Sequence, residues 1–156
     1  MDLNNNVGYL LQHLSGVLAK QSDQVLRERL GIGFSQLRIL MCLEVNPSAR
    51  QRYIADSLGQ TEASISRQIK LMQAKSLLWT KISPKNRREH MITPTTKGMR
   101  VTDEALRILN EFHAPMFGVM SEKHQQLLLD ILTQMHAHSC QLGKTGACHQ
   151  FLHSPV

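Results

Sequence analysis

Residues 51–76 read QRYIADSLGQTEASISRQIKLMQAKS, with apolar residues spaced by three and four on both sides of one glycine. That spacing predicts a short helix before the glycine and a second helix over about 62–75. Gly59 permits the left-handed backbone of a turn, and Thr61 can cap the second helix. The small side chain of Ala55 lets two helices cross closely. The segment is a predicted helix-turn-helix, with a shared apolar face made of Ile54, Leu58, Ile65, Ile69 and Met72.

The second helix of this pair keeps short polar and basic side chains on its outward side. Such side chains near a helix N-terminus can approach base edges in the DNA major groove. Arg67 suits either a guanine or a phosphate, and the sequence leaves both roles open. An ordinary helical hairpin with a polar outer face is the alternative interpretation. The residues that we assign to DNA contact here are Thr61, Glu62, Ala63, Ser64, Ser66, Arg67 and Lys70.

A predicted β-hairpin follows the second helix directly. Apolar and polar residues alternate over residues 78–82, and residues 90–93 form the return strand. Arginine at a hairpin tip suits the narrow, electronegative minor groove beside a major-groove site. A solvated turn would also carry charge, but the position just after the helix favours a DNA-binding wing. The wing residues assigned to DNA contact are Lys85, Asn86, Arg87 and Arg88.

Helices are also predicted before this segment. Apolar residues at three- and four-residue spacing predict one long amphipathic helix over about 5–30, ended by Gly31 and Gly33. Ser35 is expected to cap the next helix. Residues 48–51, Ser-Ala-Arg-Gln, have the pattern of a capping box that opens the first helix of the helix-turn-helix.

Two further helices are predicted after the hairpin. The first starts at Thr95 and carries an apolar stripe past Pro115, where it can bend or split. The second follows Ser121, which can cap it. The terminal helices carry more apolar surface than they can bury alone, and such stripes are usually covered by a partner chain. A symmetric homodimer through residues 5–30 and 121–138 is the simplest expectation.

The expected fold is therefore mainly α with a small β-hairpin. A winged helix-turn-helix domain is flanked by N- and C-terminal dimerisation helices. The expected boundaries are 1–32 for the N-terminal dimerisation helix, 33–98 for the winged helix-turn-helix domain, 99–138 for the C-terminal dimerisation helices and 139–156 for a flexible tail. A chain of 156 residues with 42% apolar composition is long enough for one such core.

The positive charge is concentrated in the same segment. The chain has a net charge of +6, but residues 50–100 alone hold eleven Lys or Arg against three acidic residues. A merely solvated surface would interleave the two signs more evenly. Basic charge confined to one third of the chain can neutralise phosphates, which favours a nucleic-acid partner.

Several other classes of protein are disfavoured. No apolar run approaches the roughly 18 residues of a membrane helix, and the start has no secretory pattern. The three cysteines make no disulfide framework, so a cytoplasmic protein without a membrane partner is expected. No phosphate loop, nucleophile elbow or HExxH motif occurs, so neither an enzyme nor a cofactor is expected. A helical module whose basic strip meets an acidic protein remains an alternative.

The last 21 residues gather histidine and cysteine side chains. These side chains suit zinc or copper, but their spacing matches no established finger, and we predict no metal site. A metal- or redox-responsive regulator that uses this cluster is an alternative function. Cys42 lies in an apolar run and is expected to be a buried core residue. The candidate ligands of the cluster are His136, His138, Cys140, Cys148, His149 and His153.

The sequence resembles the MarR family of bacterial transcriptional regulators over about residues 5–138. Its most specific stretches are IADSLGQTEASISRQIKLMQAKSLL, residues 54–78, and SPKNRREHMITPTTKG, residues 83–98. The family's wing reads Asp-x-Arg-Asp-x-Arg, and Arg88 matches its second arginine. Departures from the family pattern are Ser83 and Asn86 at the aspartates, Lys85 at the first arginine, Pro94 at a leucine and Ser76 at a glycine.

The resemblance implies a winged-helix homodimer whose terminal helices interlock and whose two recognition helices read a pseudo-palindromic operator. Many members of the family are repressors. The resemblance also implies that a small-molecule effector or an oxidant can change the spacing of the recognition helices. The predicted function is thus sequence-specific binding of double-stranded DNA by a homodimeric repressor.

Overall fold

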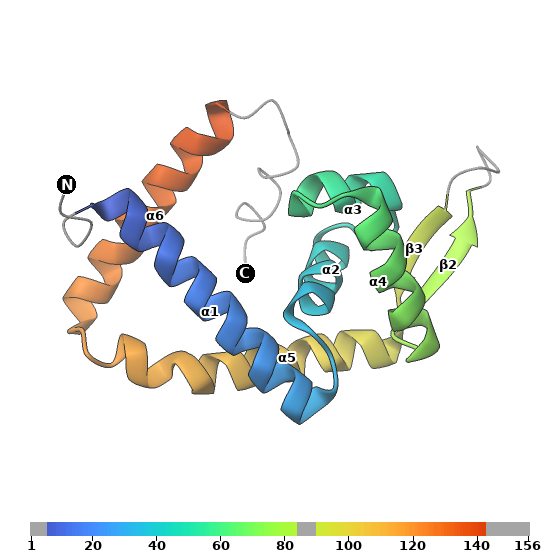
Figure 1. The fold of residues 1–156 in the computed structure, drawn as a ribbon, viewed down its shortest axis with the longest axis horizontal. Coiled ribbons are helices and arrows are strands. Elements are labelled where there is room, and N and C mark those ends of the chain that lie inside the picture. The colour runs from blue at the N-terminus through green and yellow to red at the C-terminus, as the bar shows by residue number, and fades with distance from the viewer. Residues whose placement is uncertain (1–5, 84–89, 143–156) are drawn as a thin grey trace.

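The computed structural model describes residues 6–83 and 90–142, and within those residues it has six helices and three strands. Figure 1 shows α2, α3, α4 and the sheet gathered at one end, while α1 and α5 extend from there toward α6 at the other end. The expected mainly α fold is confirmed. The elements are α1 (Val7–Leu30), α2 (Phe34–Val45), β1 (Ala49–Arg50), α3 (Gln51–Leu58), α4 (Glu62–Ala74), β2 (Leu78–Ile82), β3 (His90–Pro94), α5 (Thr96–Phe117) and α6 (Glu122–Leu142).

One apolar core joins α2, α3, α4, the sheet and the first half of α5. Helix α1 enters this core only near its C-terminal end, through Val25 and Leu26. Removing these apolar side chains from water is the main stabilising contribution to this part of the fold. The largest fully buried apolar side chains are Leu26, Ile32, Leu37, Ile39, Leu40, Leu43, Ile54, Ile65, Met72, Leu77 and Ile92.

The start of α2 differs from the sequence prediction. The N-cap is Gly33 rather than Ser35, and the helix has already begun at Phe34. The Phe34 amide donates to Oδ1 of Asp23 at 2.8 Å, and the Gly33 amide donates to Oε1 of Gln36 at 3.2 Å. Because a carboxylate from α1 and the Gln36 side chain accept these amides, the helix needs no hydroxyl cap at its N-terminus.

The predicted capping box at residues 48–51 is also wrong. Ala49 and Arg50 form the short strand β1, which pairs antiparallel with β3, so that Ala49 lies opposite Ile92. Arg50 is then the N-cap of α3 and has extended backbone. The predicted hairpin is real, but it is part of a three-stranded sheet in the order β1-β3-β2. The register of β1 depends on a contact with residues about forty positions away, which local sequence does not report.

The helix-turn-helix forms as expected. Gly59 has φ of 61°, in the left-handed region, and ends α3. The Thr61 side chain accepts a hydrogen bond from the Ser64 amide at 3.2 Å and caps α4. All five residues of the predicted shared apolar face are buried.

The first of the two C-terminal helices is continuous, and the second is longer than the sequence indicates. Helix α5 continues through Pro115 to Phe117, so it is not split there. The His124 amide donates to Oγ of Ser121 at 3.4 Å, as expected for the cap of α6. Helix α6 then extends to Leu142, beyond the predicted end near residue 138. No described helix combines the length and apolar character needed to cross a membrane.

Candidate nucleic-acid interface

The outward face of α4 is polar and accessible. Glu62, Ala63, Arg67 and Lys70 are exposed, and Ser64 and Ser66 are half-buried. The opposite face is buried in the core. Together with the exposed cap Thr61, all seven residues that the sequence assigned to this helix therefore lie away from the core.

The N-terminal end of α4 is fixed in place by three hydrogen bonds. Besides the Thr61 cap, the Ser64 hydroxyl donates to Oε1 of Gln60 at 3.3 Å. The Gln51 side chain at the start of α3 donates to the Glu62 carbonyl at 3.2 Å. In contrast, Arg67 and Lys70 form no hydrogen bond or ion pair with any residue that the structure describes. These two cations are therefore available to an external partner.

Sequence reasoning missed the start of α3 as part of this surface. The bond from Gln51 to the Glu62 carbonyl places the N-terminal ends of α3 and α4 side by side. Arg52 is exposed there, in a long ion pair with Asp56 at 3.9 Å. Free amides at a helix N-terminus also attract anions such as phosphate. The signal was present in the sequence, as basic residues at the first turn of a predicted helix.

A cavity of about 360 Å³ separates α4 from the strands of the wing. Ser66 and Lys70 of α4 line one side, and Thr80 and His90 of the strands line the other. The Thr80 hydroxyl is buried and has no hydrogen-bond partner among the residues that the structure describes. The wing residues predicted to touch DNA, namely Lys85, Asn86, Arg87 and Arg88, lie outside the described residues.

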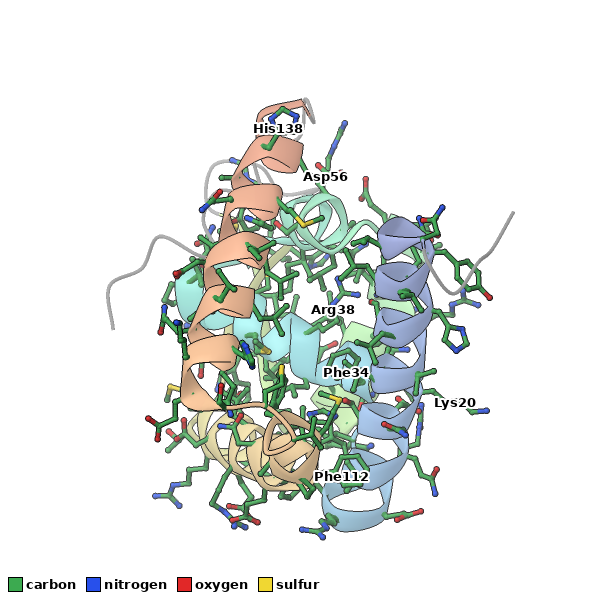
Figure 2. All side chains as sticks on the ribbon, turned by 90° about the vertical axis from the view of Figure 1, so that its left-hand side faces the viewer. Lys20, Phe34, Arg38, Asp56, Phe112 and His138 are labelled. Atoms are coloured by element: carbon green, nitrogen blue, oxygen red, sulfur yellow. The ribbon has the colours of Figure 1, made fainter. Side chains whose placement is uncertain are left out.

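A second cavity of about 460 Å³ lies between α2, α3 and α5 and reaches His136 of α6. Its lining is mainly apolar, with Arg38 and Asn110 among its polar members. The Arg38 guanidinium donates to the Leu58 carbonyl at 3.2 Å. Figure 2 shows Phe34 and Arg38 near the middle of the molecule, between α1 and α6. Local sequence patterns do not predict this cavity, because its walls come from four separate helices.

The cysteine and histidine candidates do not form a described metal site. His136 is half-buried and His138 exposed on α6, while the Cys140 side chain, Cys148, His149 and His153 lie outside the described set. Among the described residues no three potential ligands gather around a common point. Cys42 is fully buried, as expected, and this burial raises the pKa of its thiol. It is therefore protonated at neutral pH and poorly reactive.

The fold and the outward face of α4 define a winged helix-turn-helix protein. Residues 30–89 match the family model described as MarR family. Over these residues the chain is similar to the MarR family, in agreement with the resemblance of its sequence motifs. No curated protein sequence matches it.

Solved structures share the fold over most of the chain. A MarR transcriptional regulator from Methanosarcina mazei Go1 is 19% identical, with a TM-score of 0.79 over 88% of this chain and 98% of that chain. MepR of Staphylococcus aureus, in complex with DNA, is 23% identical, with a TM-score of 0.70 over 85% and 97%. CouR from Rhodococcus jostii RHA1, bound to p-coumaroyl-CoA, is 19% identical, with a TM-score of 0.71 over 86% and 94%.

Proposed function

We propose that this protein is a transcriptional regulator that binds double-stranded DNA in a sequence-specific manner. The observation that carries the proposal is the outward face of α4, where Arg67 and Lys70 are exposed on a helix whose other face is held in the core. A rigid helix with free basic side chains suits the major groove. The structure of MepR in complex with DNA, which has a similar fold, supports DNA binding by a chain of this fold.

Within this surface, different residues have different tasks. Ser64 and Arg67 lie three residues apart and face base edges, with Thr61, Glu62, Ala63, Ser66 and Lys70 completing the contact. Arg67 reads a guanine or holds a phosphate. The wing residues Lys85, Asn86, Arg87 and Arg88 add charge in the adjacent minor groove, where directional readout is poor. Sequence preference therefore comes mainly from α4, whereas affinity for DNA comes from both α4 and the wing.

The protein acts as a homodimer through residues 5–30 and 121–138. Exposed apolar side chains line the N-terminal half of α1, the end of α5 and α6, and a second copy is the simplest cover for them. Two symmetric α4 helices would read a pseudo-palindrome, and occupancy of a promoter would repress transcription in the cytoplasm. Light scattering at low micromolar concentration should give twice the 17.7 kDa chain mass. The exposed residues are Val7, Tyr9, Leu10, Leu14, Val17, Phe112, Phe117, Val119, Leu127, Leu129, Ile131, Leu132 and Met135.

A small-molecule effector would bind in the cavity of about 460 Å³. This cavity touches α2 and α3 on one side and α6 on the other, so a ligand there contacts both the helix-turn-helix and a terminal helix. A ligand that fits only one relative position of these parts would shift their equilibrium. The ligand-bound structure of CouR supports an effector for proteins of this fold.

The function is tested by selecting bound duplexes from a random pool with the full chain. We expect one enriched motif with two related half-sites. If Arg67 reads a base, Arg67→Ala should weaken binding to the enriched duplex by roughly 1–3 kcal/mol and relax the preference at one base pair. Replacing Arg87 and Arg88 with alanine should weaken binding to every duplex alike. It should also flatten the slope of log affinity against log salt concentration by about one to two units.

Lys123→Ala is the matched control, because Lys123 is an exposed basic residue of α6, away from α4, and is not one of the apolar side chains that the proposed dimer would cover. It should leave both the preference and the slope unchanged. A pool that yields no preferred sequence would contradict the proposal and favour a module that binds an acidic protein.

A further inference from the structure

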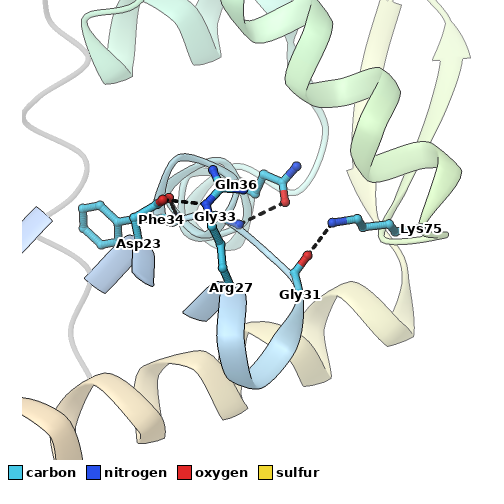
Figure 3. Close-up of polar contacts among 7 residues, drawn as sticks. All are labelled: Asp23, Arg27, Gly31, Gly33, Phe34, Gln36 and Lys75. Carbon is cyan, nitrogen blue, oxygen red and sulfur yellow. Dashed lines mark hydrogen bonds and ion pairs between the residues drawn. The ribbon is translucent and has the colours of Figure 1, made fainter. Parts of the chain in front are cut away.

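One lysine connects the end of α4 directly to the end of α1. Lys75 is the C-cap of α4, and its Nζ donates a hydrogen bond to the carbonyl oxygen of Gly31, which is the C-cap of α1 (Figure 3). The main packing partners of α1 are instead α2 and α5. Lys75 therefore adds a polar link between two helices that share little apolar contact.

The chemistry of this link follows from the two helix ends. The carbonyl end of a helix carries partial negative charge, which a nearby cation stabilises. Gly31 has φ of 66°, so the chain turns away in the left-handed region and its carbonyl leaves the helical ladder. The Lys75 ammonium thus lies at the negative end of α1, while the Lys75 backbone is the C-cap of α4.

The backbone of Lys75 is held from a third helix. Lys97, in the first turn of α5, donates from Nζ to the Lys75 carbonyl at 2.8 Å. Next to it, the Thr95 hydroxyl donates to the Ser76 carbonyl at 2.8 Å. The position from which the Lys75 side chain reaches α1 is therefore fixed by α5.

The backbone of the connection between α1 and α2 is also held tightly. The Asp23 carboxylate accepts from the Phe34 amide at 2.8 Å and from Nε of Arg27 at 2.6 Å, as Figure 3 shows. Only residues 31–33 separate the two helices. A Cβ on Gly33 would lie 2.9 Å from Oδ1 of Asp23, so the backbone there is close against this pair. The backbone at Gly31 is therefore held in place by the contacts on either side of this short connection.

We propose that Lys75 is a positioning residue, which sets the direction of the recognition helix α4 relative to the long helix α1. The proposal rests on the proposed function, because α4 is positioned for DNA. Lys75 is eight residues beyond Arg67, which is about 12 Å along a helix. It acts through the placement of α4 and not through its own contact with the duplex.

The first test needs no DNA. Spin labels are placed at Lys20→Cys on α1 and Ala63→Cys on α4, both exposed, with Cys140 and Cys148 replaced by serine and Cys42 left buried. Labelled chain is diluted in unlabelled chain, so that only distances within one chain are measured. Lys75→Met should broaden or shift the distance distribution, and Lys75→Arg should keep it narrow. A Lys75→Met distribution equal to that of Lys123→Met overturns the proposal.

The second test measures binding to the duplex that the unmodified chain selects from a random pool. Lys75→Met should lose about fivefold in affinity, the scale of a charge at a helix terminus, with the salt slope unchanged. Lys75→Arg should retain the affinity. A slope reduced by about one unit would make Lys75 a phosphate contact and overturn the positioning role. If the unmodified chain selects no duplex, the proposed function fails, while the distance measurement still decides the role of Lys75.

Discussion

The two ends of the molecule use the same kind of amphipathic helix in opposite ways. At the winged end, meaning α2, α3, α4 and the sheet, the apolar faces meet inside one chain, and Leu40 is only 1% exposed. At the terminal end, meaning the first half of α1, the end of α5 and α6, they face outward, and Leu129 is 58% exposed. Helix α1 belongs to both, since Leu26 is buried and Leu10 is 45% exposed. The winged end therefore completes its core within one chain, whereas the terminal end leaves apolar side chains that the proposed dimer would cover.

The largest loss of stability should come from a substitution in the core of the winged end. Leu40→Ala removes a fully buried side chain and should lower the free energy of unfolding by about 2–5 kcal/mol. Because the cavity forms inside one chain, the loss should be the same at every protein concentration. Urea denaturation at two concentrations checks this. A loss that changes strongly with concentration would mean that the core, too, depends on a second chain.

The next effect concerns the terminal end. Ile131→Glu places a charge among the exposed apolar residues of α6 and should weaken the dimer by roughly 2 kcal/mol or more, about thirtyfold in Kd. Light scattering across a dilution series measures this shift. Gln126→Glu adds the same charge at an exposed polar position of α6 and should leave the mass unchanged. Equal masses for the two variants would show that α6 is not part of the dimer interface.

Two glycines differ in the space around them: Gly98 packs closely against a neighbouring backbone, and Gly16 faces open space. A Cβ on Gly98 would lie 2.3 Å from the Leu77 carbonyl oxygen, so Gly98→Ala should cost about 1–3 kcal/mol. A Cβ on Gly16 of α1 meets nothing within 4 Å, so Gly16→Ala should add roughly 0.5–1 kcal/mol of helix stability. Thermal unfolding measures both. If Gly16→Ala instead dissociates the dimer, that face of α1 lies directly against the partner.

The smallest loss of stability is expected at the junction between the two ends. Asp23→Ala should cost roughly 0.5–2 kcal/mol at neutral pH, the usual value for a lost helix-capping side chain. The hydrogen bond from Arg27, together with that of the Phe34 amide, holds the pKa of Asp23 below its usual 3.8, against the opposing effect of burial. The stabilisation is therefore fully present above that unfolded-state pKa and is lost as the pH falls through the lower folded-state pKa. Denaturation from pH 7 to pH 2 should show the difference from wild type shrinking only below about pH 4, and a constant difference would exclude the ionised carboxylate as its source.

The sequence predicted the helix-turn-helix because its signals are local. Apolar spacing, the left-handed turn at Gly59 and the hydroxyl cap at Thr61 are all read within one short segment. The errors at Ser35 and at residues 48–51 have the opposite cause. The start of α2 is capped by Asp23 from another helix, and β1 exists only because β3 returns beside it. Contacts between distant residues leave no periodic trace.

The candidate site was predictable to a similar extent. The outward residues of α4 followed from helical geometry, once the buried face was known. The position of Gln51 and Arg52 beside α4, and the link from Lys75 to Gly31, required the packing of the helices in space. The apolar stripes of the terminal helices were visible in the sequence, but only the structure divides α1 into a covered and an uncovered half.

The most direct test is the mass of the complex with the duplex selected from a random pool, measured by sedimentation beside a scrambled duplex of equal length. We expect two 17.7 kDa chains on each selected duplex and no stable complex on the scrambled one at the same salt. One chain per duplex would contradict the dimer, and equal binding to both duplexes would contradict sequence-specific recognition by α4.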